Sequence, residues 1–119
     1  RYVCIEALNS QDGKDLACIA EMYFLDKDGS RLSREPWIVK YADSEDVAHV
    51  NRSADKTFDL QESTYWSTEK GSPYPHTIVI DLGSSHAVTG FQCLPRMESE
   101  VPGGIKDFKI YVKGENFKY

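Results

Sequence analysis

Short runs of alternating apolar and polar residues, separated by turn-forming residues, are the feature that most restricts the fold of this chain. Residues 2–8 (YVCIEAL) and 108–113 (FKIYVK) both alternate with a period of two, and in the second run we expect Phe108, Ile110 and Val112 to face inward. Such alternation predicts β-strands with one face in a core.

Further β-prone runs are predicted between these two. They lie at residues 16–25, 36–41, 65–67, 76–83 and 87–94. Turn signals rich in Gly, Pro, Asn and Asp separate them, and residues 42–57 are polar and irregular, with room for one short helical turn. Short strands with almost no helix predict one domain, residues 1–119, folded as an antiparallel β-sandwich.

The charge and the cysteines exclude several classes of function. A net charge of −5 argues against nucleic-acid binding, which needs a basic surface, and no apolar run is long enough to span a membrane.

Residues 1–5 read as a strand and not as a signal peptide, so we expect either a cytoplasmic chain or a piece of a longer exported protein. Cys4, Cys18 and Cys93 have no metal-site spacing and are expected to be buried or half-buried thiols that act as small apolar residues. The alternative is one disulfide between two of them.

No residue pattern points to catalysis. His49, His76 and His86 are scattered and are expected at the surface or at strand edges, and the chain lacks both HExxH and GxSxG. The 19 acidic residues would form pairs by chance, so a carboxylate dyad cannot be derived from them. We therefore expect a domain that is not an enzyme.

Two kinds of binding site remain open on the residues alone. Asp59 and Thr64 offer a carboxylate and a hydroxyl in one loop, and Glu21, an isolated acid in an apolar run, could add a second carboxylate to a calcium site. The alternative is an ordinary hydrogen-bonded turn.

A sugar site is the second possibility, with Glu45, Tyr74, His76 and Arg96 as contributors. Trp37 and Trp66 lie inside strand-like runs and are expected in the core.

Three segments, in order, resemble a known family. FDLQESTYWST (residues 58–68), PHTIVIDLG followed by VTGFQCLPR, and GIKDFKIYV resemble the discoidin-type modules, also called coagulation factor V/VIII type C or galactose-binding-like domains. The chain is most similar to modules appended to bacterial glycoside hydrolases of the chitobiase (β-hexosaminidase) kind. The resemblance implies a jelly-roll β-sandwich.

The order of the strands departs from the usual family order. Strands like residues 1–8 (RYVCIEAL) and 19–25 (IAEMYFL) normally close such a domain, whereas here they come first. The resemblance therefore implies a circular permutation, with the N-terminal strand in the place of the missing last strand.

The resemblance also implies site residues. A structural calcium would be held by side chains of Glu21, Asp59 and Thr64 and by carbonyls near Lys56 and Gln61. Leu60 stands where the family has glycine. The family's sugar-binding positions correspond to Glu45, Ser67, Lys70, Arg96 and Pro102, of which Glu45 and Arg96 keep the usual residue type.

These observations predict a non-catalytic, monomeric carbohydrate-binding module of an exported glycosidase, located outside the cell, in the periplasm or at the cell surface. Its partners would be a glycan, bound weakly by loops at one end of the sandwich, and the catalytic domain of the parent enzyme. The alternative is a structural or protein-docking module without sugar binding.

Overall fold

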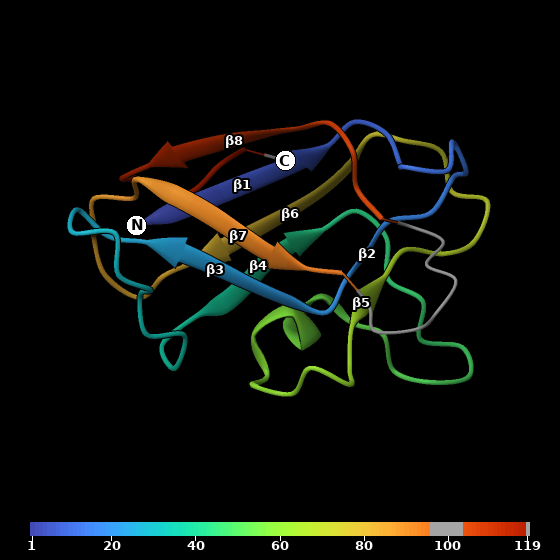
Figure 1. Cartoon of the computed structure of the whole chain (residues 1–119), viewed down its shortest axis with the longest axis horizontal. Helices are drawn as coiled ribbons and strands as arrows, with labels where there is room; N and C mark the ends of the chain where they lie inside the picture. Colours follow the sequence, from blue (N-terminus) through green and yellow to red (C-terminus); the bar gives the residue numbers. More distant parts are fainter. Residues whose placement is uncertain (96–103, 119) are drawn as a thin grey trace.

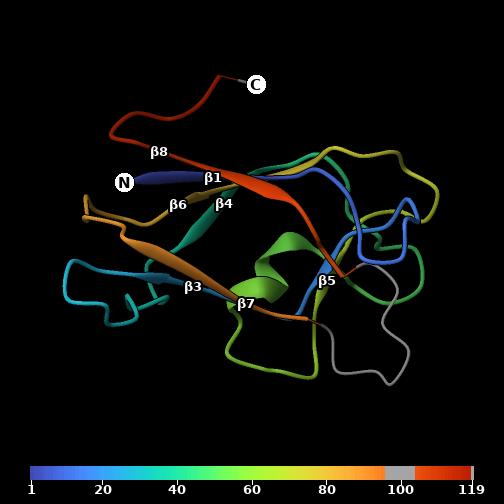
Figure 2. The ribbon, with the colours of Figure 1, turned by 45° about the horizontal axis from the view of Figure 1, so that its top comes forward.

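The computed structural model describes residues 1–95 and 104–118 as two layers of β-strands (Figures 1 and 2). The larger layer is a four-stranded antiparallel sheet. In spatial order it contains β4 (Ile38–Ala42), β6 (His76–Asp81), β1 (Tyr2–Ala7) and β8 (Phe108–Lys113). The second layer contains the pairs β3 (Glu21–Leu25) with β7 (Gly90–Leu94), and β2 (Cys18–Ile19) with β5 (Trp66–Ser67). The predicted antiparallel sandwich is confirmed.

The first strand lies inside the large sheet. β1 pairs with β6 through Tyr2–Asp81 to Ala7–His76, and with β8 through Tyr2–Lys113 to Ala7–Phe108. Both of its edges are therefore hydrogen-bonded, and Val3, Cys4, Ile5 and Ala7 are buried. This position agrees with the expectation that the N-terminal strand completes the sheet.

The core lies between the layers and is built around the two tryptophans. Trp66 is buried in the same core cluster as Ala54 of the 3-10 helix η1 (Ala54–Phe58), and its indole N–H donates to the carbonyl of Ser44. Trp37 packs edge-on against Phe58 and 5.0 Å, ring centre to ring centre, from Phe24. Both were predicted to be core anchors, and both are.

Three details of the sequence prediction were wrong. The apolar run at 16–25 forms two strands, β2 and β3, because it crosses from one strand pair to the other. In β8, Phe108 and Val112 are exposed, and of the three residues expected to face inward only Ile110 is partly buried. The reason is that β8 is the edge strand of the sheet, where neighbouring residues cover the inward face less completely. Among the cysteines, Cys4 and Cys18 are buried but Cys93 is exposed, and all three are free thiols.

Among the described residues, no helix has the length and apolar character needed to cross a membrane.

Candidate functional site

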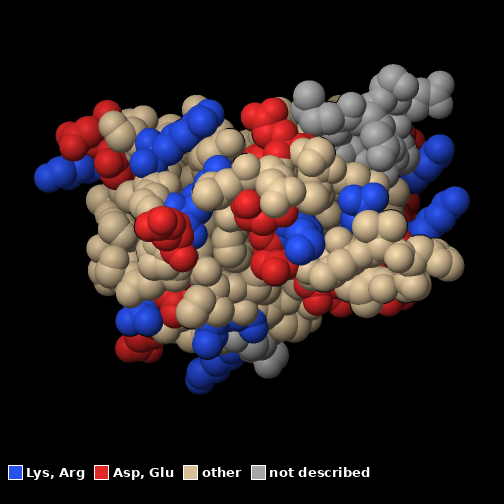
Figure 3. All heavy atoms as spheres, turned by 90° about the horizontal axis from the view of Figure 1, so that it is seen from below, with Lys and Arg blue, Asp and Glu red and all other residues tan. Residues whose placement is uncertain are grey.

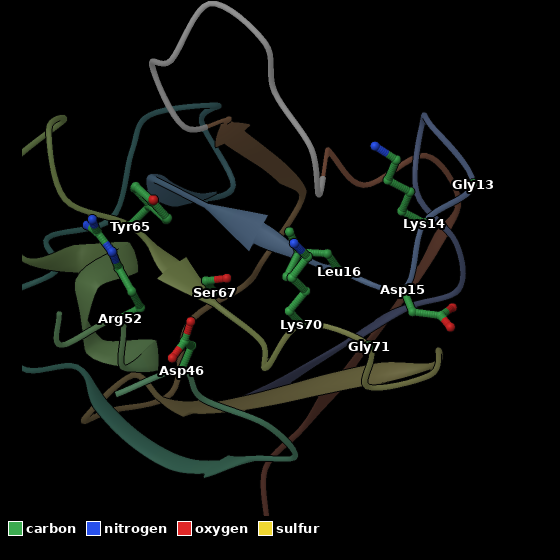
Figure 4. Close-up of a pocket in the computed structure, with 10 residues that line it drawn as sticks. All are labelled: Gly13, Lys14, Asp15, Leu16, Asp46, Arg52, Tyr65, Ser67, Lys70 and Gly71. Atoms are coloured by element: carbon green, nitrogen blue, oxygen red, sulfur yellow. The ribbon is translucent and has the colours of Figure 1, made fainter. Parts of the chain in front are cut away.

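A cavity of about 640 Å³ lies at one end of the sandwich, beside β2 and β5 (Figure 4). Its wall combines residues from three parts of the chain: 13–16, 46–52 and 65–71. Ser67 and Lys70, two positions that the resemblance assigns to sugar contacts, both line it. A volume of this size lies within the range of about 300–1,000 Å³ that small-molecule sites occupy.

The loops around the cavity are held by hydrogen bonds that cross between segments. The amide of Thr68 donates to the carbonyl of Ala17, and the Thr68 hydroxyl accepts from the Ala17 amide. The amide of Ser67 donates to the carbonyl of Arg52, and that of Asp46 to the carbonyl of Ser67. The wall is therefore an organised part of the fold.

Glu45 and Tyr74, two of the predicted sugar contacts, are engaged within the protein. A Glu45 carboxylate oxygen accepts from the amide of Ala54 at 2.7 Å and so caps the start of η1. The Tyr74 hydroxyl donates to the carbonyl of Leu16, and burial raises the pKa of this phenol. Neither side chain lines the cavity that contains Ser67 and Lys70.

His76 is fully buried, which corrects the expectation of a surface or strand-edge histidine. Its Nδ1 lies 2.8 Å from a carboxylate oxygen of Asp43, and its Nε2 lies 3.0 Å from the carbonyl oxygen of Ser72. The ring also packs edge-on against Tyr74. In this position His76 ties the start of β6 to two loops, and it does not line the cavity. The remaining predicted positions, Arg96 and Pro102, lie outside the described residues.

The predicted metal ligands do come together, at the loop that follows η1. The Thr64 hydroxyl donates to a carboxylate oxygen of Asp59 and lies 3.1 Å from the carbonyl oxygen of Gln61. Glu21 faces the same loop from β3 with only 1 % of its surface exposed. Burial raises the pKa of Glu21, and the neighbouring Asp59 carboxylate raises it further. Lys56 lies in η1, three residues before Asp59.

One oxygen of this cluster lacks a partner. Glu21 Oε1 is buried and has no hydrogen-bond partner among the described residues. A buried carboxylate oxygen without a partner costs free energy, which a cation at this point would reduce. The described residues contain no cluster of three or more His, Cys, Asp or Glu suited to a metal. A calcium here would thus need hydroxyl, carbonyl and water oxygens besides the two carboxylates.

Sequence reasoning missed Arg34, which supplies a cation to the same cluster. Its guanidinium donates to Glu21 Oε2, and it also lies 4.2 Å from the ring centre of Tyr23. Arg34 belongs to the loop between β3 and β4, and no spacing in the sequence links it to Glu21. The rule that a buried acid needs a partner was the available signal, but it did not say which partner.

Leu60 adopts the conformation that glycine favours. Its φ is +66°, in the left-handed region, and it is the one described residue other than glycine with a positive φ. Asp59 caps the C-terminal end of η1 and Leu60 follows it, the position where a left-handed glycine commonly ends a helix. The loop therefore keeps the backbone shape expected for the glycine of the family signature, with leucine in its place.

Comparison with known proteins gives the family. The family model of the F5/8 type C domain matches residues 40–119, more than half of the chain. This chain belongs to the F5/8 type C family. The match begins in β4, so it does not test the order of β1 to β3.

Two relatives carry a similar segment. A sialidase of Micromonospora viridifaciens is 34 % identical over 73 residues, which is 58 % of this chain and 11 % of the relative. A galactose oxidase of Gibberella zeae is 31 % identical over 91 residues, which is 73 % of this chain and 13 % of the relative. This F5/8 type C chain thus spans only a small part of the length of the relatives it matches.

The surface of the F5/8 type C domain carries both signs of charge. On the face shown in Figure 3, acidic and basic side chains are interspersed among uncharged residues. No continuous basic field covers this face, in line with the net charge of −5.

Proposed function

We propose that this F5/8 type C domain is a non-catalytic carbohydrate-binding module of an exported glycoside hydrolase. The cavity lined by Ser67 and Lys70 is the observation that carries the proposal, because it lies where the family resemblance puts sugar contacts. The names of the two relatives, a sialidase and a galactose oxidase, support an association with enzymes of sugar chemistry. An open site of this kind gives weak affinity, in which most of the interaction energy is offset by the cost of association.

A glycan array followed by calorimetry tests the proposal. We expect binding to at least one glycan, and we expect it to weaken when either Lys70 or Arg96 is changed to alanine. Lys27→Ala is the matched control, because Lys27 is also an exposed lysine but does not line the cavity. Failure of the wild-type domain to bind any glycan would refute carbohydrate binding.

A protein-docking role is the alternative, and one observation favours it. Phe108, Tyr111 and Val112 of edge strand β8 are exposed to about the same extent, 44–46 %. An apolar edge strand is suited to packing against a neighbouring domain. Under this alternative the domain binds the catalytic domain of a chitobiase-like parent enzyme, Tyr111→Ser weakens that contact, and no glycan binds.

We also propose a structural calcium ion in the loop after η1. Glu21, Asp59 and Thr64 would hold it through side chains, with the carbonyl of Gln61 and one near Lys56. The unpartnered Glu21 Oε1 supports the proposal. The carboxylates of Glu21 and Asp59 carry two negative charges, and the single positive charge of Arg34 balances only one of them. The ion would neutralise the remaining charge and fix this loop against β3.

Thermal unfolding with and without calcium tests the metal. A domain that binds calcium unfolds at a higher temperature when the ion is added, and a chelator reverses the shift. We expect Asp59→Ala to abolish the shift and Asp12→Ala, which changes an exposed acid elsewhere, to keep it. Magnesium at the same concentration serves as the charge control, because it prefers a smaller octahedral site. A shift that survives Asp59→Ala would place the ion elsewhere.

The remaining proposals concern the state of the protein. We propose that the domain is monomeric and acts outside the cytoplasm, at the cell surface, in the periplasm or in the medium. Sedimentation of the isolated domain tests the first, and fractionation of cells that produce the full-length protein tests the second.

A further inference from the structure

Three cationic side chains line the cavity described above, each from a different segment. Lys14 comes from the loop before β2, Arg52 from the loop before η1, and Lys70 from the turn after β5. In Figure 4, Lys70 extends toward the middle of the group, and Arg52 and Lys14 lie on opposite sides of it. None of the three forms an ion pair with another residue of the described chain.

Two acids, Asp15 and Asp46, also line the cavity, but in the described part of the chain neither forms an ion pair with these cations. The Asp15 carboxylate is directed away from the other labelled side chains in Figure 4. The Asp46 carboxylate lies 3.4 Å from the amide nitrogen of Ala48 in its own loop. The described wall therefore carries three cations against two carboxylates, an excess of one positive charge in a chain whose net charge is −5.

Arg52 is held in place before any ligand arrives. Its guanidinium lies 4.0 Å from the ring centre of Tyr65, which is 8 % exposed and thus fixed in the protein. Its amide donates to the carbonyl of Asp46, and its own carbonyl accepts from Ser67. A guanidinium fixed in this way loses little side-chain entropy on binding an anion, and its planar fork matches a carboxylate or sulfate.

The described wall offers few uncharged groups for sugar hydroxyls. Gly13, Leu16 and Gly71 have no polar side chain, and the Ser67 hydroxyl is occupied by the carbonyl of Thr68 and the thiol of Cys18. The phenol of Tyr65 is the other uncharged side-chain hydroxyl of the described wall. Recognition by this wall therefore depends on charge more than on the pattern of hydroxyls.

We infer that this cavity binds an acidic sugar, whose carboxylate or sulfate pairs with Arg52 and Lys70. The inference rests on the carbohydrate-binding function proposed above and names the class of sugar. Lys14, on the far side of the cavity from Arg52, adds a third charge for a second acidic residue of the same glycan. Charge-assisted hydrogen bonds of this kind are about twice as strong as neutral ones.

Matched sugar pairs test this inference, because each pair differs only in the charged group. The pairs are galactose with galacturonic acid, glucose with glucuronic acid, and galactose with galactose 6-sulfate, each titrated by calorimetry or NMR. We expect the acidic member to bind about tenfold more tightly, the factor expected from one charge-assisted hydrogen bond. The uronic acids and the sulfate ester distinguish the two anion chemistries, and added salt should reduce the preference.

Two variants locate the effect. Lys70→Gln should remove most of the preference for the acidic member, whereas Lys27→Gln, which removes the same charge from an exposed turn outside the cavity, should keep it. Arg52→Gln should act like Lys70→Gln, provided that thermal unfolding shows that the Tyr65 region remains folded.

The outcomes separate this inference from the proposed function. Equal affinity for the acidic and neutral members overturns the acidic-sugar inference and leaves carbohydrate binding in place. Equal losses in Lys70→Gln and Lys27→Gln also overturn it, since the attraction would then come from overall charge. Binding of no glycan at all overturns both.

Discussion

At position 60 we expect glycine to give a more stable protein than alanine, because the backbone there is left-handed. This conformation costs a residue with a Cβ about 1–2 kcal/mol relative to the right-handed one. Glycine avoids that cost but loses about 0.4–1 kcal/mol through its greater freedom in the unfolded chain. At φ +66°, Leu60→Gly should therefore be more stable than Leu60→Ala by about 0.5–1 kcal/mol.

The comparison of glycine with alanine removes the effect of the leucine side chain. Leu60 is 67 % exposed, so truncation loses the burial of about a third of the side chain, on the order of 0.5–1 kcal/mol. Both variants lose this contribution, so it cancels between them. Compared with wild type, Leu60→Ala should be destabilised by that amount, and Leu60→Gly should be close to neutral.

Urea unfolding monitored by tryptophan fluorescence measures the difference. A chelator should be present throughout, so that changes in calcium affinity do not contribute. The variants should share one m-value, since they expose the same surface on unfolding, and differ in midpoint.

Ser63 supplies the matched control, because it is exposed, lies in the same loop and has no positive φ. There the order should reverse, with Ser63→Ala more stable than Ser63→Gly by about 0.4–1 kcal/mol. If alanine is the more stable variant at both positions, Leu60 is not left-handed in solution and the reasoning is refuted.

Three further predictions follow from ion pairs and strand order. Arg34→Gln should destabilise the domain by about 3 kcal/mol in urea unfolding, because it leaves the Glu21 carboxylate buried without its partner. The double variant with Glu21→Gln should recover part of this loss, and purely additive effects would contradict the pairing. Deletion of residues 1–8 should abolish cooperative unfolding, because it removes β1, the strand between β6 and β8. An unchanged melting temperature would exclude the pairing of β1 with these two strands. The hydrogen bond from Arg1 lowers the pKa of Asp81. The Arg1–Asp81 pair should therefore stabilise the folded state above a pH of about 4, and this stabilisation should be lost as the pH falls through the folded-state pKa of Asp81. Asp81→Asn should flatten this part of the stability curve measured from pH 2 to 6.

Much of the candidate metal site could be predicted from the sequence. Asp59 and Thr64 are close in the chain, and the family signature marks them, so only Glu21 had to come from a distant strand. Its contribution was inferred from the family resemblance, and its place as an acid in an apolar run was a separate sign that it needs a partner. Arg34 could not be inferred in the same way, since a loop cation can reach any of several acids and only the folded chain brings it to Glu21.

The sugar site was much less predictable. Ser67 and Lys70 line the cavity and stand at family sugar positions, but they lack the usual residue types and were not among the predicted contacts; Lys14, Arg52 and Tyr65 were not predicted either. These side chains come from loops that are far apart in sequence, and loops lack the periodicity that reveals strands. Residue type suggested His76 as a ligand, but a polar residue at the start of a strand can equally be buried when loop acceptors surround it.

The sequence by itself determined that this chain forms an antiparallel sandwich, that both tryptophans lie in its core, and that it resembles the family to which it belongs. Alternation and buried aromatic residues are local properties, and they are readable because the hydrophobic effect acts on every strand in the same way. Only the tertiary structure decided which polar residues remain available to a ligand. Glu45, Tyr74 and His76 are engaged within the protein, and Arg52 and Lys70 are left facing the cavity, because hydrogen-bond partners are chosen among groups that meet only after the chain has folded.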